Sequence, residues 1–328
     1  MPAYQPPFQI TSLILRQVAA ISELIGRWSV VHEGALSPQL RRENRIRTIH
    51  ASLAIENNTL SLDQVTAVFE GKRVMGMPRE IQEVRNAILA YEQMDSWTPY
   101  SSRSLLDAHK VLMVALVDRA GVWRQGGVGI YRGDALVHMA PPASQVPRLV
   151  DDLTGWLETT DTHPLIASCV FHYEFEFIHP FEDGNGRMGR LWQTLILSRW
   201  QPLLAHLPVE SLVHDRQADY YSALSEADKR SEATVFVEFM LQAILDAMSE
   251  SEAASSVKSS EKSSEKSSEI VIDLLMTSPS MSARELASKL EMTPRGVEKI
   301  LARLRELGQL ERIGGARNGH WIVKVKKP

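Results

Sequence analysis

Cysteine is almost absent from this chain: Cys169 is the single one among 328 residues, so no internal disulfide can form. Long apolar runs are absent too, and none approaches the roughly 20 residues that a membrane-spanning helix needs. The N-terminus lacks a basic region followed by an apolar core, which is the pattern of a secretory signal. We therefore expect a protein of the reducing cytoplasm, without a membrane partner. The hydrophobic content of 44% and charged content of 23% are ordinary for a globular protein.

Apolar side chains are nearly missing from residues 249–269, where Lys-Ser-Ser-Glu recurs. Such a segment cannot bury a core, and its composition predicts a flexible low-complexity linker. The linker would separate a large region, residues 1–248, from a small domain, residues 270–328.

Apolar residues in the large region recur mostly at helical spacing, which predicts a mainly α fold. The expected helices cover residues 8–30, 38–57, 61–70, 78–95, 101–117, 144–159, 164–177, 187–199, 217–227 and 232–248.

The sequence of the small domain predicts three helices followed by a hairpin. Ser282-Ala-Arg-Glu285 is a capping box that opens one helix, and Thr293-Pro294 opens the next with a cap and a first-turn proline. Gly314-Gly315 and Asn318-Gly319 indicate the hairpin. This order predicts a winged helix-turn-helix, and its last helix would bury four apolar residues: Val297, Ile300, Leu301 and Leu304.

Basic side chains are concentrated in the small domain, with eleven Lys and Arg against six Asp and Glu in residues 270–328. Arg295, Lys299 and Arg303 are expected on the exposed side of the last helix, as in a DNA-reading helix. DNA is therefore one expected partner. Use of the same domain for protein contacts or dimerisation remains open.

Residues that can bind phosphate or transfer a proton are most concentrated in the segment 179–190, His-Pro-Phe-Glu-Asp-Gly-Asn-Gly-Arg-Met-Gly-Arg. Pro180 and the glycines cannot continue the preceding helix, so the chain turns here and a new helix is expected from Arg187. Backbone amides of a Gly-rich turn that leads into a helix N-terminus form an anion cradle. Gly184, Asn185 and Gly186 are the residues of that turn.

Charged side chains complete this constellation. Arg187 and Arg190 lie about one turn apart and can both fork onto phosphate oxygens. Asp183 is placed to hold a Mg²⁺ ion that bridges those oxygens. His179 can accept the proton of an incoming hydroxyl. The residues indicate a phosphoryl- or nucleotidyl-transfer site based on positioning and charge neutralisation.

Three other interpretations of these residues account for the set less well. Gly184, Gly186 and Gly189 match the GxGxxG pattern of a dinucleotide-binding site. That pattern requires a preceding strand, whereas a helix is expected here. A metal hydrolase is suggested by four side chains whose spacing fits no zinc motif: His172, Glu174, Glu176 and His179. A merely structural turn with surface arginines does not account for the whole set.

The order of residues 179–190 resembles the Fic family signature HPFx[D/E]GNGRxxR at every defined position. The resemblance implies a Fic-type helical bundle over residues 1–248 and transfer of AMP from ATP to a Ser, Thr or Tyr hydroxyl of a target protein. It implies that His179 is the general base, that Asp183 holds Mg²⁺, and that Gly184–Gly186 cradle the phosphates. Arg187 and Arg190 would steady the phosphates, the latter at the γ position.

A second motif strengthens the resemblance. Ser52-Leu-Ala-Ile-Glu56-Asn57 is similar to the inhibitory signature [S/T]xxxE[G/N] of self-restrained Fic proteins. Ser52 and Glu56 lie one helical turn apart and share a face. In that family the glutamate pairs with the second motif arginine, here Arg190, so an inhibitory helix is expected at about residues 45–57.

Two further segments resemble parts of the Fic site. Residues 129–142 are similar to the family's β-hairpin flap, which pairs with the target's main chain. Tyr221 and Leu224 match the segment that lines the adenine pocket, although Asp228 stands where relatives often carry asparagine. For both segments a role in closing the core remains open.

Two alternatives to a gated adenylyltransferase remain. Glu56 could orient a water that removes AMP from a modified protein. The chain could instead be a DNA-binding regulator whose site senses nucleotide, although sensing alone needs no base. A homodimer is also compatible with the resemblance.

Overall fold

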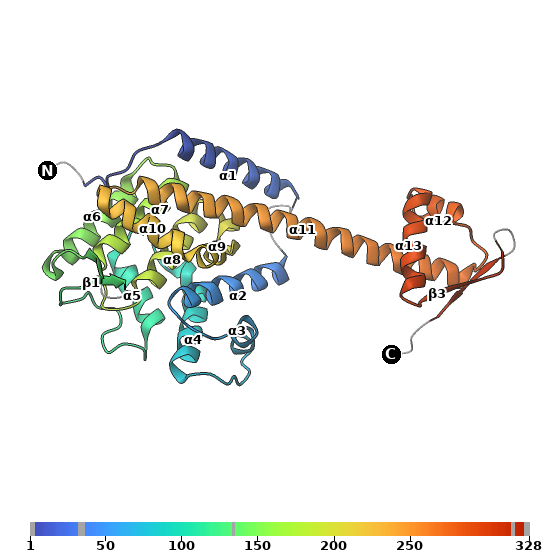
Figure 1. The fold of residues 1–328 in the computed structure, drawn as a ribbon, viewed down its shortest axis with the longest axis horizontal. Coiled ribbons are helices and arrows are strands. Elements are labelled where there is room, and N and C mark those ends of the chain that lie inside the picture. The colour runs from blue at the N-terminus through green and yellow to red at the C-terminus, as the bar shows by residue number, and fades with distance from the viewer. Residues whose placement is uncertain (1–3, 32–36, 133–134, 316–318, 325–328) are drawn as a thin grey trace. The chain divides into compact units, whose positions relative to one another are not determined.

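In a computed structural model the chain is described over residues 4–31, 37–132, 135–315 and 319–324. It divides into two compact units, Met1–Ser251 and Glu252–Pro328 (Figure 1). Both units are mainly helical, and each described part contains one two-stranded antiparallel sheet. The predicted mainly α fold with a hairpin is therefore confirmed.

The first unit contains every helix that the apolar spacing predicts. Its elements are α1 (Ser12–Val31), α2 (Pro38–Ile55), α3 (Leu62–Phe69), α4 (Pro78–Gln93), η1 (Met94–Ser96), α5 (Ser102–Met113), β1 (Gly129–Arg132), β2 (Ala135–Met139), η2 (Ala143–Gln145), α6 (Val146–Thr159), α7 (Pro164–Ile178), α8 (Asn185–Trp200), η3 (Pro202–His206), α9 (Val209–Asp215), α10 (Gln217–Arg230) and the start of α11 (Thr234–Thr277).

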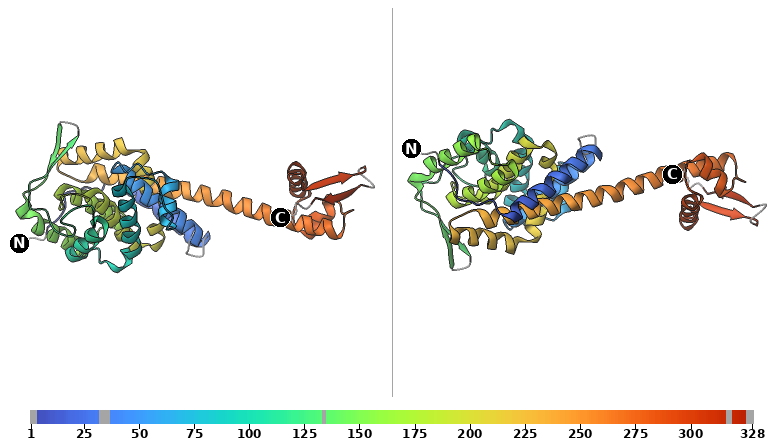
Figure 2. Two further views of the ribbon diagram at one scale, coloured as in Figure 1. Left: turned by 90° about the horizontal axis from the view of Figure 1, so that it is seen from below. Right: turned by 90° about the horizontal axis from the view of Figure 1, so that it is seen from above.

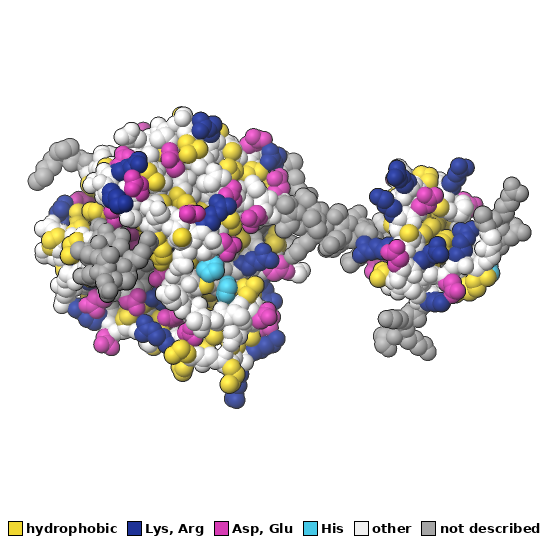
Figure 3. All heavy atoms as spheres, in the orientation of Figure 1, with side chains coloured by type: hydrophobic (Ala, Val, Ile, Leu, Met, Phe, Trp, Pro, Cys, Tyr) yellow, Lys and Arg dark blue, Asp and Glu magenta, His cyan; other side chains and the backbone are white. Residues whose placement is uncertain are grey.

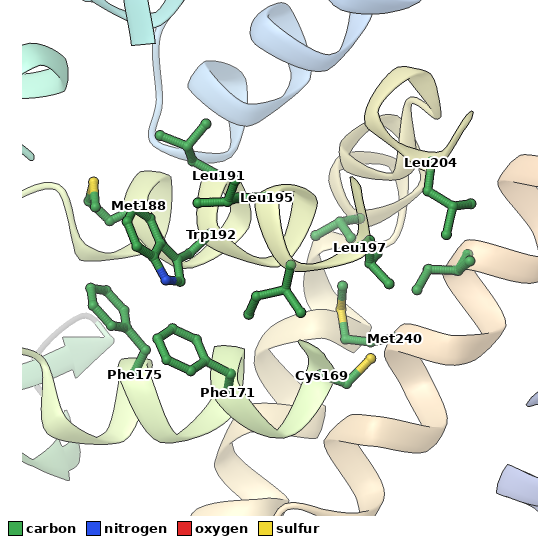
Figure 4. Packing of buried hydrophobic residues seen from close by; sticks show 14 of the residues in the cluster. Cys169, Phe171, Phe175, Met188, Leu191, Trp192, Leu195, Leu197, Leu204 and Met240 are labelled. Atoms are coloured by element: carbon green, nitrogen blue, oxygen red, sulfur yellow. The ribbon is translucent and has the colours of Figure 1, made fainter. Parts of the chain in front are cut away.

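Helices α7 and α8 form the centre of the first unit (Figure 1). In α7, 12 of 15 residues are buried, and in α8, 13 of 16, so both are covered by neighbours on nearly every side. Phe171 and Phe175 of α7 lie toward Met188 and Trp192 of α8 (Figure 4). This packed pair fixes the two ends of the loop that joins the helices, residues 179–184.

The hairpin β1–β2 lies at the edge of the first unit (Figure 2). Gly129 pairs with Met139, and the register shifts between Ile130 and Tyr131, where a bulge breaks the ladder. The structure thus contains the hairpin that was expected over residues 129–142. Its predicted turn, Gly133-Asp134, lies outside the described residues.

The second unit has its own core, formed by the end of α11, α12 (Ala283–Lys289), α13 (Pro294–Glu306), β3 (Leu310–Ile313) and β4 (His320–Val323). The capping box of Ser282 and Glu285 is present, as is the Thr293 cap before Pro294. All four residues predicted to be buried on α13 are buried. The order of elements is the one that the sequence predicts, and part of the expected turn, residues 316–318, lies outside the described residues.

The predicted flexible linker is a helix in this structure. Helix α11 runs from Thr234 to Thr277 and passes through residues 249–269 without a break. The segment contains no proline or glycine, so nothing in its backbone chemistry interrupts a helix. The boundary between the two units falls near the start of this segment, after Ser251, and the segment is helical in the structure, which its composition did not predict.

The structure also bears on the single cysteine and on the apolar character of the helices. Cys169 is fully buried, and burial raises the pKa of its thiol to about 12, which keeps it protonated. Within the described residues, no helix combines the length and the apolar character that crossing a bilayer requires.

Candidate active site

The loop between α7 and α8 begins and ends in left-handed backbone. His179 terminates α7 with φ 49° and ψ 61°, and its backbone N–H donates to Phe175. Gly184 precedes α8 with φ 84°, a conformation that favours glycine, and a Cβ there would lie 2.7 Å from the sulfur of Met113. Left-handed residues thus stand at both ends of this loop, which starts at His179 and leads directly into the first turn of α8.

The side chain of Asn185 closes the loop on itself. Its Oδ1 accepts from the backbone N–H of Phe181 at 2.9 Å, and its Nδ2 donates to the Phe181 carbonyl at 2.9 Å. Asn185 is buried, so these bonds satisfy both ends of its amide. Asn185 therefore acts here by holding the loop's shape, in addition to any contact with phosphate.

Arg124 is a buried support that the sequence did not reveal. Its guanidinium donates to the carbonyls of His179 at 2.7 Å, Ile178 at 3.2 Å and Gly126 at 2.8 Å, and to the carbonyl of Pro141 at 2.5 Å. One planar fork thus joins the end of α7 to the two segments that flank the hairpin. It fixes the backbone that carries His179 relative to the hairpin.

His109 supports the loop from the other side. Its ring stacks on Phe181 with centroids 3.6 Å apart, its Nδ1 accepts from the N–H of Gly121, and its Nε2 lies 3.0 Å from the Asp183 carbonyl. These partners require the neutral tautomer with the proton on Nε2. Burial lowers the pKa of His109 to about 4, consistent with that neutral form.

Asp183 and Arg187 lie together at the start of α8. Asp183 accepts from the Gly184 N–H at 2.6 Å and from Nη2 of Arg187 at 3.1 Å, and it is 43% exposed. Arg187 is buried, and its Nε has no hydrogen-bond partner among the described residues. An unpaired buried donor of this kind can bond to an acceptor such as a phosphate oxygen.

A divalent cation can be held here by one carboxylate. No group of three or more His, Cys, Asp or Glu side chains in the described residues can form an all-protein metal cage. Mg²⁺, however, is commonly bound through one or two carboxylates together with substrate phosphates and water. The exposed carboxylate of Asp183 beside a buried arginine fits that arrangement.

Arg190 is bound by the end of α2. Its Nε donates to Oγ of Ser52 at 3.1 Å, and its Nη2 donates to the Ser52 carbonyl at 2.9 Å and to Oε1 of Glu56 at 2.7 Å. Arg190 is buried, whereas the Glu56 side chain is 33% exposed. The structure therefore contains the contact that the second motif predicts. We call the Glu56–Arg190 ion pair the gate pair.

The carboxylate of Glu56 also lies against the first turn of α8. A Cβ added at Gly186 would collide with its Oε1, so this approach requires glycine. The first turn of a helix attracts anions through its free amides and the helix dipole. Glu56 thus occupies part of the anion cradle that Gly184, Asn185 and Gly186 were predicted to form.

Asn57 explains the last position of the second motif. It has φ 67°, directly after the cap of α2, and its N–H donates to the Ala54 carbonyl at 3.0 Å. Glycine and asparagine tolerate this left-handed conformation best. The residue ends α2 so that Glu56 is the last side chain directed at Arg190.

The gate pair stabilises the charged form of Arg190. Burial alone disfavours the charged guanidinium, but the facing Glu56 carboxylate raises its pKa, and the net shift is upward. A buried cation without a partner is costly, so Arg190 has to be paired either with Glu56 or with another anion.

His179 lies at the rim with a side chain that is 17% exposed, and its Nδ1 is 3.9 Å from Oε2 of Glu176. Tyr221 and Leu224 lie on α10 and are partly buried against the core. Burial raises the pKa of Tyr221, and the Glu56 carboxylate raises it further. Asp228 accepts from the hydroxyl of Tyr173 at 3.1 Å.

The rival interpretations do not fit the geometry. A helix, α7, precedes the glycines, so the strand that a dinucleotide site needs is missing. His172 is buried, with Nδ1 2.7 Å from Oε1 of Gln193 and Nε2 3.2 Å from the Tyr220 hydroxyl. Burial lowers its pKa to about 3, as expected of a neutral core histidine.

Comparisons with known proteins agree with the geometry. Residues 99–197 match the Fic/DOC family. Protein adenylyltransferase fic-1 of Caenorhabditis briggsae is 27% identical over 237 residues, which are 67% of this chain and 44% of that protein. Protein adenylyltransferase Fic of Drosophila grimshawi is 25% identical over 247 residues, 70% of this chain and 48% of that protein. The matched part thus spans less than half of these curated relatives.

Solved structures extend the likeness to the whole chain. A structure of Fic-1 from Caenorhabditis elegans shares the fold with a TM-score of 0.61 at 21% identity, and covers 74% of this chain and 73% of that one. A crystal structure of a Fic family protein from Desulfovibrio desulfuricans G20 is 51% identical, with a TM-score of 0.76, over 99% of this chain and 100% of that one. An identity this high over nearly the full length of both chains shows that this protein belongs to the Fic family.

Proposed function

We propose that this protein is a Mg²⁺-dependent protein adenylyltransferase that Glu56 holds in a restrained state. The observation that carries the proposal is the position of the Glu56 carboxylate. It lies on Arg190 at 2.7 Å and against Gly186 in the first turn of α8, where a nucleotide phosphate would bind. The names of the curated relatives, protein adenylyltransferases, support the same activity.

The reaction follows from the placement of the charged groups. His179 takes the proton of a Ser, Thr or Tyr hydroxyl on the target, and the hydroxyl oxygen bonds to the α-phosphorus of ATP. The bond from that phosphorus to the bridging oxygen breaks in line, and pyrophosphate leaves. Asp183 would hold Mg²⁺, which neutralises phosphate charge when bound.

The remaining residues orient the nucleotide. The first backbone amides of α8 donate to the phosphate oxygens, and the unpaired Nε of Arg187 supplies a further donor. Arg190 steadies the γ-phosphate once Glu56 has left it, and Tyr221 and Leu224 line the adenine side. The first amides of α8 and Arg187 are already in place, so the developing charge meets donors there that need no rearrangement, whereas Arg190 first has to be released by Glu56.

The target is expected to bind at the hairpin. In the described residues β1 and β2 pair only with each other, so the sheet has outer edges to which an extended segment can add. Arg124 links the flanks of this hairpin to the backbone of His179. A strand added there would present its hydroxyl at a defined distance from the imidazole.

The chemistry is tested in a background where the gate pair is broken. The Glu56→Gly variant, incubated with Mg²⁺ and ATP labelled at the α-phosphate, is expected to attach labelled AMP to itself or to proteins of a lysate. Adding His179→Ala should lower labelling at least 100-fold, in line with the loss of a general base. Mass spectrometry would identify the modified hydroxyl.

Equal labelling by Glu56→Gly with and without His179→Ala would refute the proposed base. Release of AMP from a modified protein by the wild type, and not by Glu56→Gly, would instead show that Glu56 activates water and that the reaction runs in the hydrolytic direction.

A second candidate function, DNA binding by the second unit, is favoured by the surface of α13. Arg295 and Lys299 are exposed and lie on the side of the helix opposite to its buried residues. Lys and Arg side chains surround the face of this unit that is visible in Figure 3. A helix with a basic outer face, followed by a hairpin, suits the major groove and the adjacent backbone.

Fluorescence anisotropy of the full chain on mixed-sequence duplex DNA tests this candidate. Binding should weaken steeply as salt rises, and replacing Arg295 and Lys299 by alanine should reduce the slope of log K against log salt by about 2. Replacing Arg103 and Arg148, exposed arginines of the first unit, removes the same charge and should change little. Equal effects of both pairs would favour a protein-binding role for the second unit.

A further inference from the structure

We infer that Glu83 is a positioning residue that couples the gate pair to Arg187, an inference that rests on the proposed function. Glu83 lies in α4, its side chain is only 12% exposed, and its two carboxylate oxygens have different partners. Oε2 accepts from Nδ2 of Asn58 at 2.8 Å. Oε1 lies 3.6 Å from Nη1 of Arg187 and 3.6 Å from Nε of Arg79.

The Asn58 side of this carboxylate controls the gate. Asn58 follows Glu56 by two residues and is bonded to α4 twice, through Glu83 and through the Glu80 carbonyl at 3.2 Å. Its Oδ1 accepts from the N–H of Leu60 at 3.1 Å, which closes a local turn. Because Asn58 is fixed on α4, the end of α2 is fixed as well, and Glu56 is kept on Arg190.

The Arg187 side of the carboxylate controls the phosphate site. Arg187 is buried and reaches Asp183 with Nη2, so Glu83 and Asp183 together fix the plane of its guanidinium. That plane sets the direction of the orphaned Nε donor. Arg79 bridges the same two acids, with Nε near Glu83 and Nη2 3.4 Å from Oδ2 of Asp183.

One side chain therefore serves two opposed purposes. It stabilises the restrained state through Asn58, and it prepares Arg187 for phosphate. Glu80 provides a natural comparison, because its carboxylate accepts from the N–H and hydroxyl of Thr59 at 2.7 and 2.8 Å. Glu80 thus secures the same segment after the gate, and none of its contacts in the described residues is with Arg187.

The two roles predict opposite effects of Glu83→Ala. When Glu56 is intact the variant should raise basal AMP labelling, and when Glu56 is replaced by glycine it should weaken ATP binding. With Glu56 intact, Glu83→Ala should loosen the end of α2 and raise basal AMP labelling about threefold. In the Glu56→Gly background the gate is already lost, so Glu83→Ala should only disturb Arg187 and raise the Kd for Mg²⁺·ATP about tenfold. Glu80→Ala should raise basal labelling without changing that Kd. Glu83→Gln keeps the size of the side chain and an oxygen that can accept from Asn58, but it loses the charge that faces Arg187. It guards against a folding defect and should raise the Kd for Mg²⁺·ATP as Glu83→Ala does.

Equilibrium ATP binding distinguishes this inference from the proposed function. If no variant transfers AMP, but Glu83→Ala and Glu83→Gln weaken ATP binding in the Glu56→Gly background and Glu80→Ala does not, the coupling role of Glu83 stands and the transferase activity fails. If the Glu83 and Glu80 variants shift the Kd alike, or if Glu83→Ala changes basal labelling in the same direction in both backgrounds, Glu83 has no coupling role.

Discussion

At the scale of single residues, the site is defined by what Arg190 binds. Its guanidinium is buried and charged, so it requires an anion, and Glu56 supplies one in this structure. A phosphate of ATP would be the alternative anion at the same place. In the proposed function, restraint and nucleotide binding therefore compete for one cation, so small changes near Glu56 should shift the balance.

Asn57 offers a mild way to shift that balance. It is exposed and has φ 67°, so substitution there alters backbone preference and leaves the packing of the core intact. A β-branched residue disfavours this conformation by roughly 1–2 kcal/mol. Asn57→Val should therefore loosen the end of α2 and raise AMP labelling up to about tenfold.

Asn57→Gly is the matched control, because glycine adopts positive φ without strain. It should label no faster than the wild type and should unfold at nearly the wild-type urea concentration, whereas the penalty of roughly 1–2 kcal/mol can lower the midpoint of Asn57→Val. If Asn57→Val and Asn57→Gly labelled equally, the conformation of this residue would have no part in restraint.

At the scale of elements, the sequence predicted the helices well because their apolar spacing is regular and capping residues mark their ends. Helix α8 begins at Asn185, two residues earlier than expected, because Gly184 turns in left-handed backbone and Asn185 bonds back to Phe181. Helix α9 was missed, since seven residues after Pro208 give too little periodicity to detect.

The composition of residues 249–269 was misleading for a different reason. Lack of apolar side chains shows that a segment cannot form a core, but it does not by itself break a helix. Helix α11 enters the segment from a buried stretch that starts at Thr234 and continues because no proline or glycine stops it.

The parts of the site that lie in continuous motifs could be predicted, and those that depend on distant contacts could not. Residues 179–190 and the Ser52–Asn57 segment carry recognisable spacing. Arg124 and His109 act mainly on backbone carbonyls and a ring that lie far away in the sequence, and no local pattern reveals such partners. No sequence pattern identifies Glu83 either, because its contacts form only once α2, α4 and α8 have packed.

At the scale of the molecule, the two units are joined by one helix and have separate cores. Every residue assigned here to AMP transfer and to the gate lies in the first unit. The basic face of α13 lies in the second unit. The proposed transferase and the candidate DNA contact can therefore be altered separately, with variants that change one and leave the other.

The central claim is that Glu56 restrains a competent site by occupying the place of a phosphate. The most direct test is kcat/KM for AMP incorporation by the full chain, measured over a range of Mg²⁺·ATP concentrations, for wild type, Glu56→Gln and Glu56→Gly. Removing the carboxylate charge should raise kcat/KM at least tenfold, about 1.4 kcal/mol or more, with Glu56→Gly at least as high as Glu56→Gln. Equal kcat/KM values for all three proteins, with the nucleotide bound in each, would contradict the claim.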